Sequence, residues 1–240
     1  MEEKELKTSL KQRIVIAVIA IIMVGSIIAS YVAIVAGGSN NTSVAEPEID
    51  EAKIAQYSEE YAEKLEEFKK ISEKDFKKFS TYRSEIKAYN ESSANTIGNV
   101  QTRDLLKGTG RKIAEDDVDY LAYYVGWCAD ETIFDSSFDN NEKPKAFDKV
   151  LDVSLGMIEG WTIGVTGMRI GGVREVTIPG ELAYGSSMEI CGGYNKPLRF
   201  LVMAVENKDP LKTAAEELDL AYMKLQYAYY GIDYEDVYGK

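Results

Sequence analysis

The chain has 240 residues, of which 45% are hydrophobic and 28% are charged, so it can form one or two domains with a substantial core. Its 40 acidic and 28 basic residues give a net charge of −12, which excludes nucleic-acid binding through a basic surface. It contains no histidine, which excludes Ser-His and Cys-His nucleophile pairs and histidine-liganded metal sites, and we expect no metal or cofactor.

Residues 14–36 form an apolar run without a charge. A helix of this length spans about 34 Å, which is enough to cross a hydrocarbon core of about 30 Å. The run is longer than the apolar part of a cleaved signal peptide, which predicts an uncleaved transmembrane helix with the lipid bilayer as partner. Four basic residues lie within residues 1–13, and the next basic residue is Lys53. This asymmetry predicts a cytoplasmic N-terminus and places everything after the helix outside the cytoplasm.

Residues 37–47 are predicted to form a linker, and residues 48–90 a helical segment. Large apolar side chains recur in that segment mostly at spacings of three and four, without a proline. One face is therefore rich in aromatic rings. That face has two interpretations, which are packing on the following domain or on the C-terminal helix, and a surface for homodimer formation or for holding clients.

After a polar break, residues 100–209 change to short β-type runs separated by Gly, Asp and Asn, which predicts an α+β domain. The expected strands are residues 102–107, 118–127, 145–150, 173–178 and 198–205. A short helix is expected within residues 156–165. Residues 210–240 are predicted to form a second amphipathic helix, over 214–230, and a tail.

The chain has two cysteines, Cys128 and Cys191. Outside the cytoplasm they could form a disulfide. Cys128 lies near an expected strand end and Cys191 lies in a Gly-rich loop, so nothing in the sequence fixes the distance between them. We expect free thiols, with a disulfide as the alternative.

Five short motifs occur in order within the expected α+β domain: YVGW at 124–127, FDSS at 134–137, MIEGW at 157–161, GMRIG at 167–171 and IPGELAYG at 178–185. This series resembles the FKBP-type peptidyl-prolyl cis-trans isomerases. The lead-in DLLKGTG at 104–110 and the closing LRFLV at 198–202 are similar to the same family. The resemblance covers about residues 100–209.

The resemblance implies an antiparallel sheet of five or six strands wrapped on a short helix, with an apolar pocket between them. Trp161 would form the floor of this pocket, and Tyr184 would stand at its rim with the hydroxyl inward. Asp135 would supply the one polar side chain, and the backbone N–H of Ile158 would hold a substrate carbonyl. The walls would be formed by Tyr124, Phe134, Ile158 and Phe200.

Isomerisation of an Xaa-Pro bond suits a site of this kind. The barrier of about 18–20 kcal/mol comes from amide resonance, and no covalent bond is broken, so neither a nucleophile nor a metal is needed. A dry aromatic cavity favours the twisted transition state, in which the charge separation of the amide is lost. The absence of histidine is therefore compatible with this activity.

Other interpretations of the same residues stay open. The aromatic residues could be plain core, and Asp135 could cap a turn. Asn140 stands where the family commonly has a basic partner for the aspartate, and residues 186–197 lack the family's usual apolar and proline run. Ile190 and Tyr194 are the large apolar residues of that loop.

We expect a single-pass membrane protein whose extracytoplasmic domain isomerises Xaa-Pro bonds of exported proteins and assists their folding. Its partners would be proline-containing polypeptides. The first alternative is an FKBP-like module that binds peptides without catalysis. The second is a structural anchor whose aromatic helices carry the function.

Overall fold

The computed structural model describes residues 49–96 and 99–238. They fall into two compact units, which are described separately. One contains Glu66–Glu216, and the described part of the other contains residues 49–65 and 217–238. The long helix α2 (Glu51–Ser80) and the helix α5 (Leu211–Tyr229) each contribute residues to both units.

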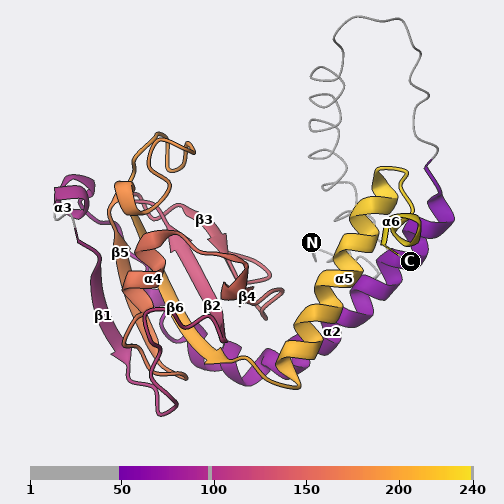
Figure 1. The fold of residues 1–240 in the computed structure, drawn as a ribbon, viewed down its shortest axis with the longest axis horizontal. Coiled ribbons are helices and arrows are strands. Elements are labelled where there is room, and N and C mark those ends of the chain that lie inside the picture. The colour runs from indigo at the N-terminus through magenta and orange to yellow at the C-terminus, as the bar shows by residue number, and fades with distance from the viewer. Residues whose placement is uncertain (1–48, 97–98, 239–240) are drawn as a thin grey trace, which may run out of the picture. The chain divides into compact units, whose positions relative to one another are not determined.

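The larger unit is built on a six-stranded antiparallel sheet with the order β1-β5-β6-β2-β3, in which β4 also pairs with β2 (Figure 1). The strands are β1 (Gln101–Leu106), β2 (Tyr120–Trp127), β3 (Ile133–Ser136), β4 (Leu151–Asp152), β5 (Val173–Ile178) and β6 (Leu198–Glu206). The two central strands, β2 and β6, pair along eight residues each and are almost completely buried. The expected antiparallel sheet is confirmed.

One expected strand is wrong. Residues 145–150 form a loop with an isolated bridge between Phe138 and Phe147, and the strand in this region is the short β4. The Asp139 carboxylate accepts hydrogen bonds from the backbone N–H groups of Lys145 and Ala146, which occupies donors that a strand would need. The strand β3, which no expectation included, pairs with β2 instead.

The short helix α4 (Glu159–Val165) lies against one face of the sheet (Figure 1). Two glycines let it approach β5 closely. A Cβ atom on Gly160 would lie 2.2 Å from Ile178 Cγ2, and one on Gly164 would lie 2.3 Å from Val176 Cγ1. Because real Cβ contacts are longer than this, both positions require glycine, and the close approach fixes the depth of Trp161 in the core.

Aromatic side chains from the second half of α2 cover the opposite face of the sheet. The Phe79 and Phe138 rings stack at 5.7 Å, the Phe76 and Phe147 rings meet edge-on at 5.4 Å, and Tyr123 of β2 stacks on Phe147 at 3.9 Å. This half of the expected helical segment therefore packs on the α+β domain, as one of the two interpretations predicted. Homodimer formation stays a prediction.

The smaller unit pairs the first half of α2 with the second half of α5. Tyr57, Leu225 and Ala228 form its buried core. At its surface Lys224 pairs with Glu60 at 3.1 Å. The short helix α6 (Tyr234–Tyr238) follows α5.

Shorter helical elements complete the described chain. They are η1 (Arg83–Glu85), α3 (Glu91–Thr96), η2 (Val153–Leu155) and η3 (Gly180–Leu182). The predicted transmembrane helix at residues 14–36 and the linker at 37–47 lie outside the described residues. Among the helices within 49–96 and 99–238, none combines the length and apolar character needed to span a bilayer.

Candidate active site

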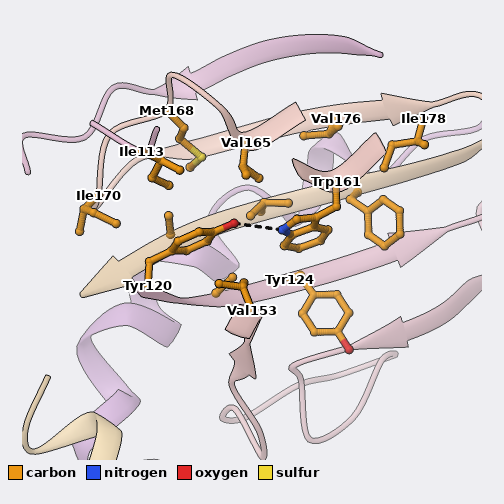
Figure 2. Close-up of a cluster of buried hydrophobic side chains, with 14 of the residues drawn as sticks. Ile113, Tyr120, Tyr124, Val153, Trp161, Val165, Met168, Ile170, Val176 and Ile178 are labelled. Atoms are coloured by element: carbon orange, nitrogen blue, oxygen red, sulfur yellow. Dashed lines mark hydrogen bonds between the residues drawn. The ribbon is translucent and has the colours of Figure 1, made fainter. Parts of the chain in front are cut away.

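Trp161 is the centre of an aromatic cluster between α4 and the sheet. Only 1% of its surface is exposed. Its ring meets Tyr124 edge-on at 6.0 Å and Phe200 edge-on at 5.4 Å, and Phe134 meets Phe200 edge-on at 5.6 Å. Edge-on pairs of this kind stabilise the arrangement beyond the burial of apolar area alone. Figure 2 shows Trp161 facing the sheet, with Tyr124 beside it.

Gly126 makes room for two of these rings. It lies on β2 directly opposite Phe200 of β6. A Cβ atom at this position would lie 2.5 Å from Phe134 Cζ and 2.8 Å from Phe200 Cε1. The glycine of the YVGW motif therefore allows the two phenylalanine rings to meet above the strand, so this motif serves the site as well as the strand.

The indole N–H of Trp161 donates to the hydroxyl of Tyr120 at 3.2 Å (Figure 2). Tyr120 is 2% exposed, and burial raises the pKa of its phenol. The hydroxyl therefore stays neutral and satisfies a buried donor that would otherwise be costly. Tyr120 was not predicted as a site residue, because a tyrosine at a strand start carries no signal for this role.

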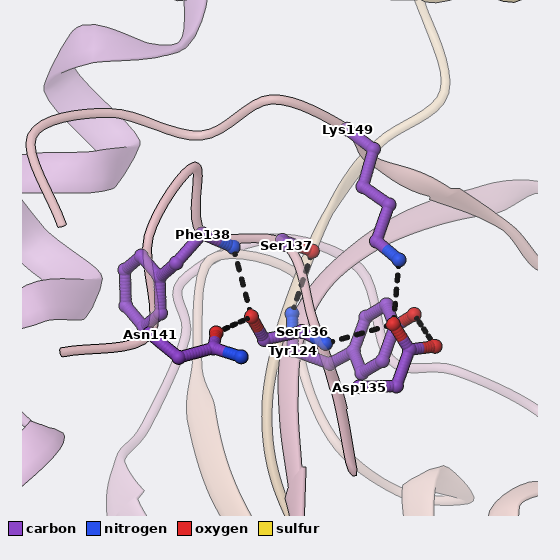
Figure 3. A network of polar contacts seen from close by, with 7 residues as sticks. All are labelled: Tyr124, Asp135, Ser136, Ser137, Phe138, Asn141 and Lys149. Carbon is purple, nitrogen blue, oxygen red and sulfur yellow. Dashed lines mark hydrogen bonds and ion pairs between the residues drawn. The ribbon is translucent and has the colours of Figure 1, made fainter. Parts of the chain in front are cut away.

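Asp135 lies at the edge of the cluster and has three partners (Figure 3). Its carboxylate accepts from the Tyr124 hydroxyl, from Lys149 Nζ at 2.5 Å and from the Ser136 backbone N–H at 2.9 Å. Burial, and then the contact with Asp135, raise the pKa of the Tyr124 phenol, which therefore stays protonated and donates. The bond to Ser136 is local, whereas the other two bring distant residues to the site.

Lys149 is thus the basic partner of Asp135, whereas the resemblance implied such a partner at position 140. Asn140, which occupies that position in the sequence, turns its side chain to the backbone N–H groups of Glu142 and Lys143. Lys149 was not predicted as a site residue, because its loop was expected to be a strand and the lysine is separated from Asp135 by 14 residues.

Ile158 and Tyr184 complete the set of seven predicted site residues. Ile158 packs on the cluster at the N-cap position of α4. No described residue accepts a hydrogen bond from its backbone N–H. Tyr184 is half-buried against the same cluster, and burial, followed by the nearby Asp135, raises the pKa of its hydroxyl. Both groups are therefore donors next to an apolar surface, and Tyr184 stays protonated at neutral pH.

The loop that follows Tyr184 is tied to β2 by a disulfide. Cys128 and Cys191 are bonded, with their Cα atoms 5.5 Å apart, and the expectation of free thiols is wrong. Cys191 has a positive φ of 55°, which turns the loop back toward the end of β2. Because 63 residues separate the two cysteines, no local pattern could indicate how far apart they lie. Of the two large apolar residues in this loop, Ile190 packs on the cluster and Tyr194 is exposed.

The structure therefore brings all seven predicted residues together: Tyr124, Phe134, Asp135, Ile158, Trp161, Tyr184 and Phe200. A separate cavity of about 210 Å³ lies beside Tyr120, Val153 and Met157, and none of the seven lines it. Among the described residues no group of acidic or cysteine side chains could hold a metal ion. The arrangement offers an apolar surface with two hydrogen-bond donors and one paired carboxylate.

Comparisons with known proteins identify similar proteins of one family. Residues 110–205 match the family model described as FKBP-type peptidyl-prolyl cis-trans isomerase. An FK506-binding protein of Neisseria meningitidis serogroup A is 34% identical over 113 residues, which cover 46% of this chain and 94% of the relative. The peptidyl-prolyl cis-trans isomerase FKBP4 of Rattus norvegicus is 37% identical over 82 residues, which cover 34% of this chain and 17% of that protein.

One solved structure is also similar to this chain. It is a peptidyl-prolyl cis-trans isomerase from Pseudomonas syringae, with 26% sequence identity and a TM-score of 0.35. The similarity covers 56% of this chain and 93% of the other.

Proposed function

The chain belongs to the FKBP-type peptidyl-prolyl cis-trans isomerase family, and we propose that the aromatic cluster around Trp161 is its catalytic centre. The observation that carries this proposal is the meeting of a buried aromatic floor with two donors that have no partner among the described residues, the Ile158 N–H and the Tyr184 hydroxyl. These are the groups that rotation about an Xaa-Pro bond can use, since the reaction needs positioning and a dry surface without any covalent step.

Each residue has a role that follows from its position. The proline ring packs on Trp161, with Tyr124, Phe134, Ile158 and Phe200 around it. Burial favours the twisted amide, which carries less charge separation than the planar one. The Ile158 N–H and the Tyr184 hydroxyl hold substrate carbonyls while the bond turns. Asp135 fixes the Tyr124 hydroxyl, and thereby the ring that forms one wall.

We further propose that the substrates are proline-containing segments of exported proteins and that residues 14–36 anchor the chain in the membrane, with residues 1–13 in the cytoplasm. The disulfide between Cys128 and Cys191 supports this location, because disulfides persist in oxidising compartments outside the cytoplasm. Protease added to the outside of intact cells should digest the domain, whereas protection from the protease would contradict the proposed orientation.

The catalytic role on a polypeptide substrate is tested with a protein whose refolding is limited by Xaa-Pro isomerisation. The full chain in mild detergent is added to an unfolded protein whose slow phase is an Xaa-Pro isomerisation, which takes on the order of tens of seconds without catalysis. We expect the rate of that phase to rise in proportion to the enzyme concentration. A slow phase that is unchanged, or is retarded by holding of the unfolded protein, would favour a non-catalytic binding module instead.

A further inference from the structure

The loop that carries Tyr184 leaves β5 after Ile178 and returns to β6 at Leu198, and its two ends meet at a narrow neck. The neck is formed by Gly180 on one side and Asn195 on the other. A Cβ atom on Gly180 would lie 2.1 Å from the Asn195 carbonyl oxygen, so this position requires glycine. Asn195 N–H also donates to the Gly185 carbonyl at 2.7 Å. The base of the loop is therefore a tight backbone junction.

The side chain of Asn95, which comes from α3, bridges this neck. Its Oδ1 accepts from the Gly180 N–H at 2.8 Å, and its Nδ2 donates to the Asn195 carbonyl at 3.1 Å. One amide group thus satisfies a donor on the outgoing side of the loop and an acceptor on the returning side. This double contact needs a side chain with both a donor and an acceptor, which an amide provides.

Gly180 also connects Asn95 to the turn around Tyr184. The Gly180 carbonyl accepts from the backbone N–H groups of Ala183 at 3.1 Å and of Gly185 at 2.9 Å. These residues flank Tyr184 directly. A change in the position of Gly180 is therefore transmitted to Tyr184 through two backbone hydrogen bonds.

The residue Tyr89 before α3 and Glu91 at the start of α3 hold the returning side of the same loop. Tyr89 donates from its hydroxyl to the Pro197 carbonyl at 2.8 Å, and Glu91 pairs with Lys196 at 2.5 Å. The guanidinium of Arg199 lies over the Tyr89 ring at 4.5 Å. These contacts place residues 89–95 along one side of the loop, and the disulfide at Cys191 holds its tip.

We propose that Asn95 is a positioning residue for catalysis: it closes the neck of the loop and so fixes the Tyr184 hydroxyl over the aromatic cluster. This inference rests on the proposed function. Asn95 lies before residues 110–205, which match the family model, so the chain supplies this contact from the segment that precedes its isomerase domain. The loop is then already ordered as one wall of the site, which lowers the free-energy cost of ordering it when a substrate binds.

The test compares Asn95→Ala with Asn95→Asp, which keeps the acceptor for Gly180 and loses the donor to Asn195. Ser93→Ala, at an exposed position of α3, is the matched control. Isomerisation of an Xaa-Pro peptide by the full chain is measured at several substrate concentrations. We expect Asn95→Ala to lower kcat about three- to tenfold with a smaller change in KM, Asn95→Asp to lie between it and wild type, and Ser93→Ala to equal wild type.

A double-mutant cycle separates positioning from general stability. If Asn95 acts through the Tyr184 hydroxyl, Asn95→Ala should lower kcat by a clearly smaller factor in a Tyr184→Phe background than in wild type. An equal loss in both backgrounds, or an Asn95→Ala variant as active as wild type, would overturn the proposal. If Asn95→Ala does not fold, Asn95→Asp is compared in the wild-type and Tyr184→Phe backgrounds in the same way.

Amide hydrogen exchange distinguishes the two possible failures. We expect the backbone N–H groups of residues 183–185 to exchange faster in Asn95→Ala than in wild type, whatever the activity. An inactive wild type would contradict the proposed function, and unchanged exchange would separately contradict the closing of the loop by Asn95.

Discussion

Lys149 Nζ lies 2.5 Å from Asp135 Oδ1, although Asp135 lies on β3, Lys149 lies in the loop before β4, and the sequence offers no pattern that joins them. The ammonium also lies 5.7 Å from the centroid of the Tyr124 ring, whose hydroxyl donates to the other carboxylate oxygen. Lys149, Asp135 and Tyr124 therefore form one connected group at the edge of the aromatic cluster (Figure 3).

This group predicts unequal effects of removing its members. The side chains of Lys149 and Asp135 are 45% and 46% exposed, so their ion pair contributes no more than about 1 kcal/mol. Lys149→Met should lower kcat/KM less than about fivefold, with a smaller effect at high salt. Asp135→Ala should lower it more, because it also removes the acceptor for the Tyr124 hydroxyl. Lys145→Met, in the same loop as Lys149, is the control. A larger loss of kcat/KM in Lys149→Met than in Asp135→Ala would contradict this order.

Tyr184→Phe isolates the contribution of one hydroxyl. No described residue accepts or donates a hydrogen bond at that hydroxyl, so its removal leaves the fold unchanged. We expect a two- to tenfold loss of kcat/KM, about the value of one hydrogen bond, with the same melting temperature. Tyr194→Phe, at an exposed position of the same loop, should behave as wild type. Equal activities of both variants would exclude the Tyr184 hydroxyl as a substrate donor.

Trp161→Phe and Trp127→Phe form a matched pair. Both tryptophans are buried, and both indoles donate one hydrogen bond, from Trp161 to the Tyr120 hydroxyl and from Trp127 to the Lys87 carbonyl. Each substitution should destabilise the domain by about 1–3 kcal/mol in urea unfolding. Trp161→Phe should also lower kcat/KM, whereas Trp127→Phe should retain it below the unfolding transition. A parallel loss of activity in both would mean that Trp161 acts through stability alone.

Removal of the disulfide should destabilise the domain but leave the aromatic cluster around Trp161 in place. The disulfide closes a loop over a sequence separation of 63 residues. The expected stabilisation of the folded state is about 2–4 kcal/mol. The Cys128→Ser/Cys191→Ser variant should unfold at lower urea than the oxidised wild type, and a reductant should bring wild type to the same midpoint. A midpoint of wild type that does not respond to complete reduction would contradict this contribution.

Asp148 predicts a dependence of stability on pH. Burial raises the pKa of its carboxyl to about 6, with a smaller opposing effect of Lys149. Since the folded protein binds this proton more tightly than the unfolded chain, Asp148 reduces stability as the pH rises from about 4 through 6, by no more than about 3 kcal/mol. The unfolding free energy of Asp148→Asn should therefore exceed that of wild type at pH 7.5, and the difference should shrink as the pH falls toward 4. A difference that is constant over this range would contradict the assignment.

The parts of the fold that follow from local pattern were predictable from the sequence. The strand β5 was predicted at its observed bounds, and α4 and the long strands were predicted to within a few residues, because apolar runs bounded by turn residues define them. The seven site residues were predicted from a series of short sequence motifs, because the order and spacing of these motifs resemble those of the family. The loop at residues 145–150 was predicted as a strand, because the side chain of Asp139 takes backbone donors there and this contact leaves no trace in periodicity.

The long-range contacts were not predictable. The pairings of Cys128 with Cys191 and of Asn95 with Gly180 and Asn195 depend on how loops fold back in three dimensions. Polar residues such as these are common in turns, so their types alone do not distinguish a bridging side chain from a solvated one.

The catalytic role of the aromatic cluster can be measured by NMR, as exchange between the cis and trans forms of a short Xaa-Pro peptide without a coupled protease. We expect the folded full chain to accelerate this exchange in proportion to its concentration, and Trp161→Phe, but not Trp127→Phe, to lower the acceleration. Exchange at the uncatalysed rate in the presence of folded wild type would contradict the claim that the aromatic cluster around Trp161 is a catalytic centre.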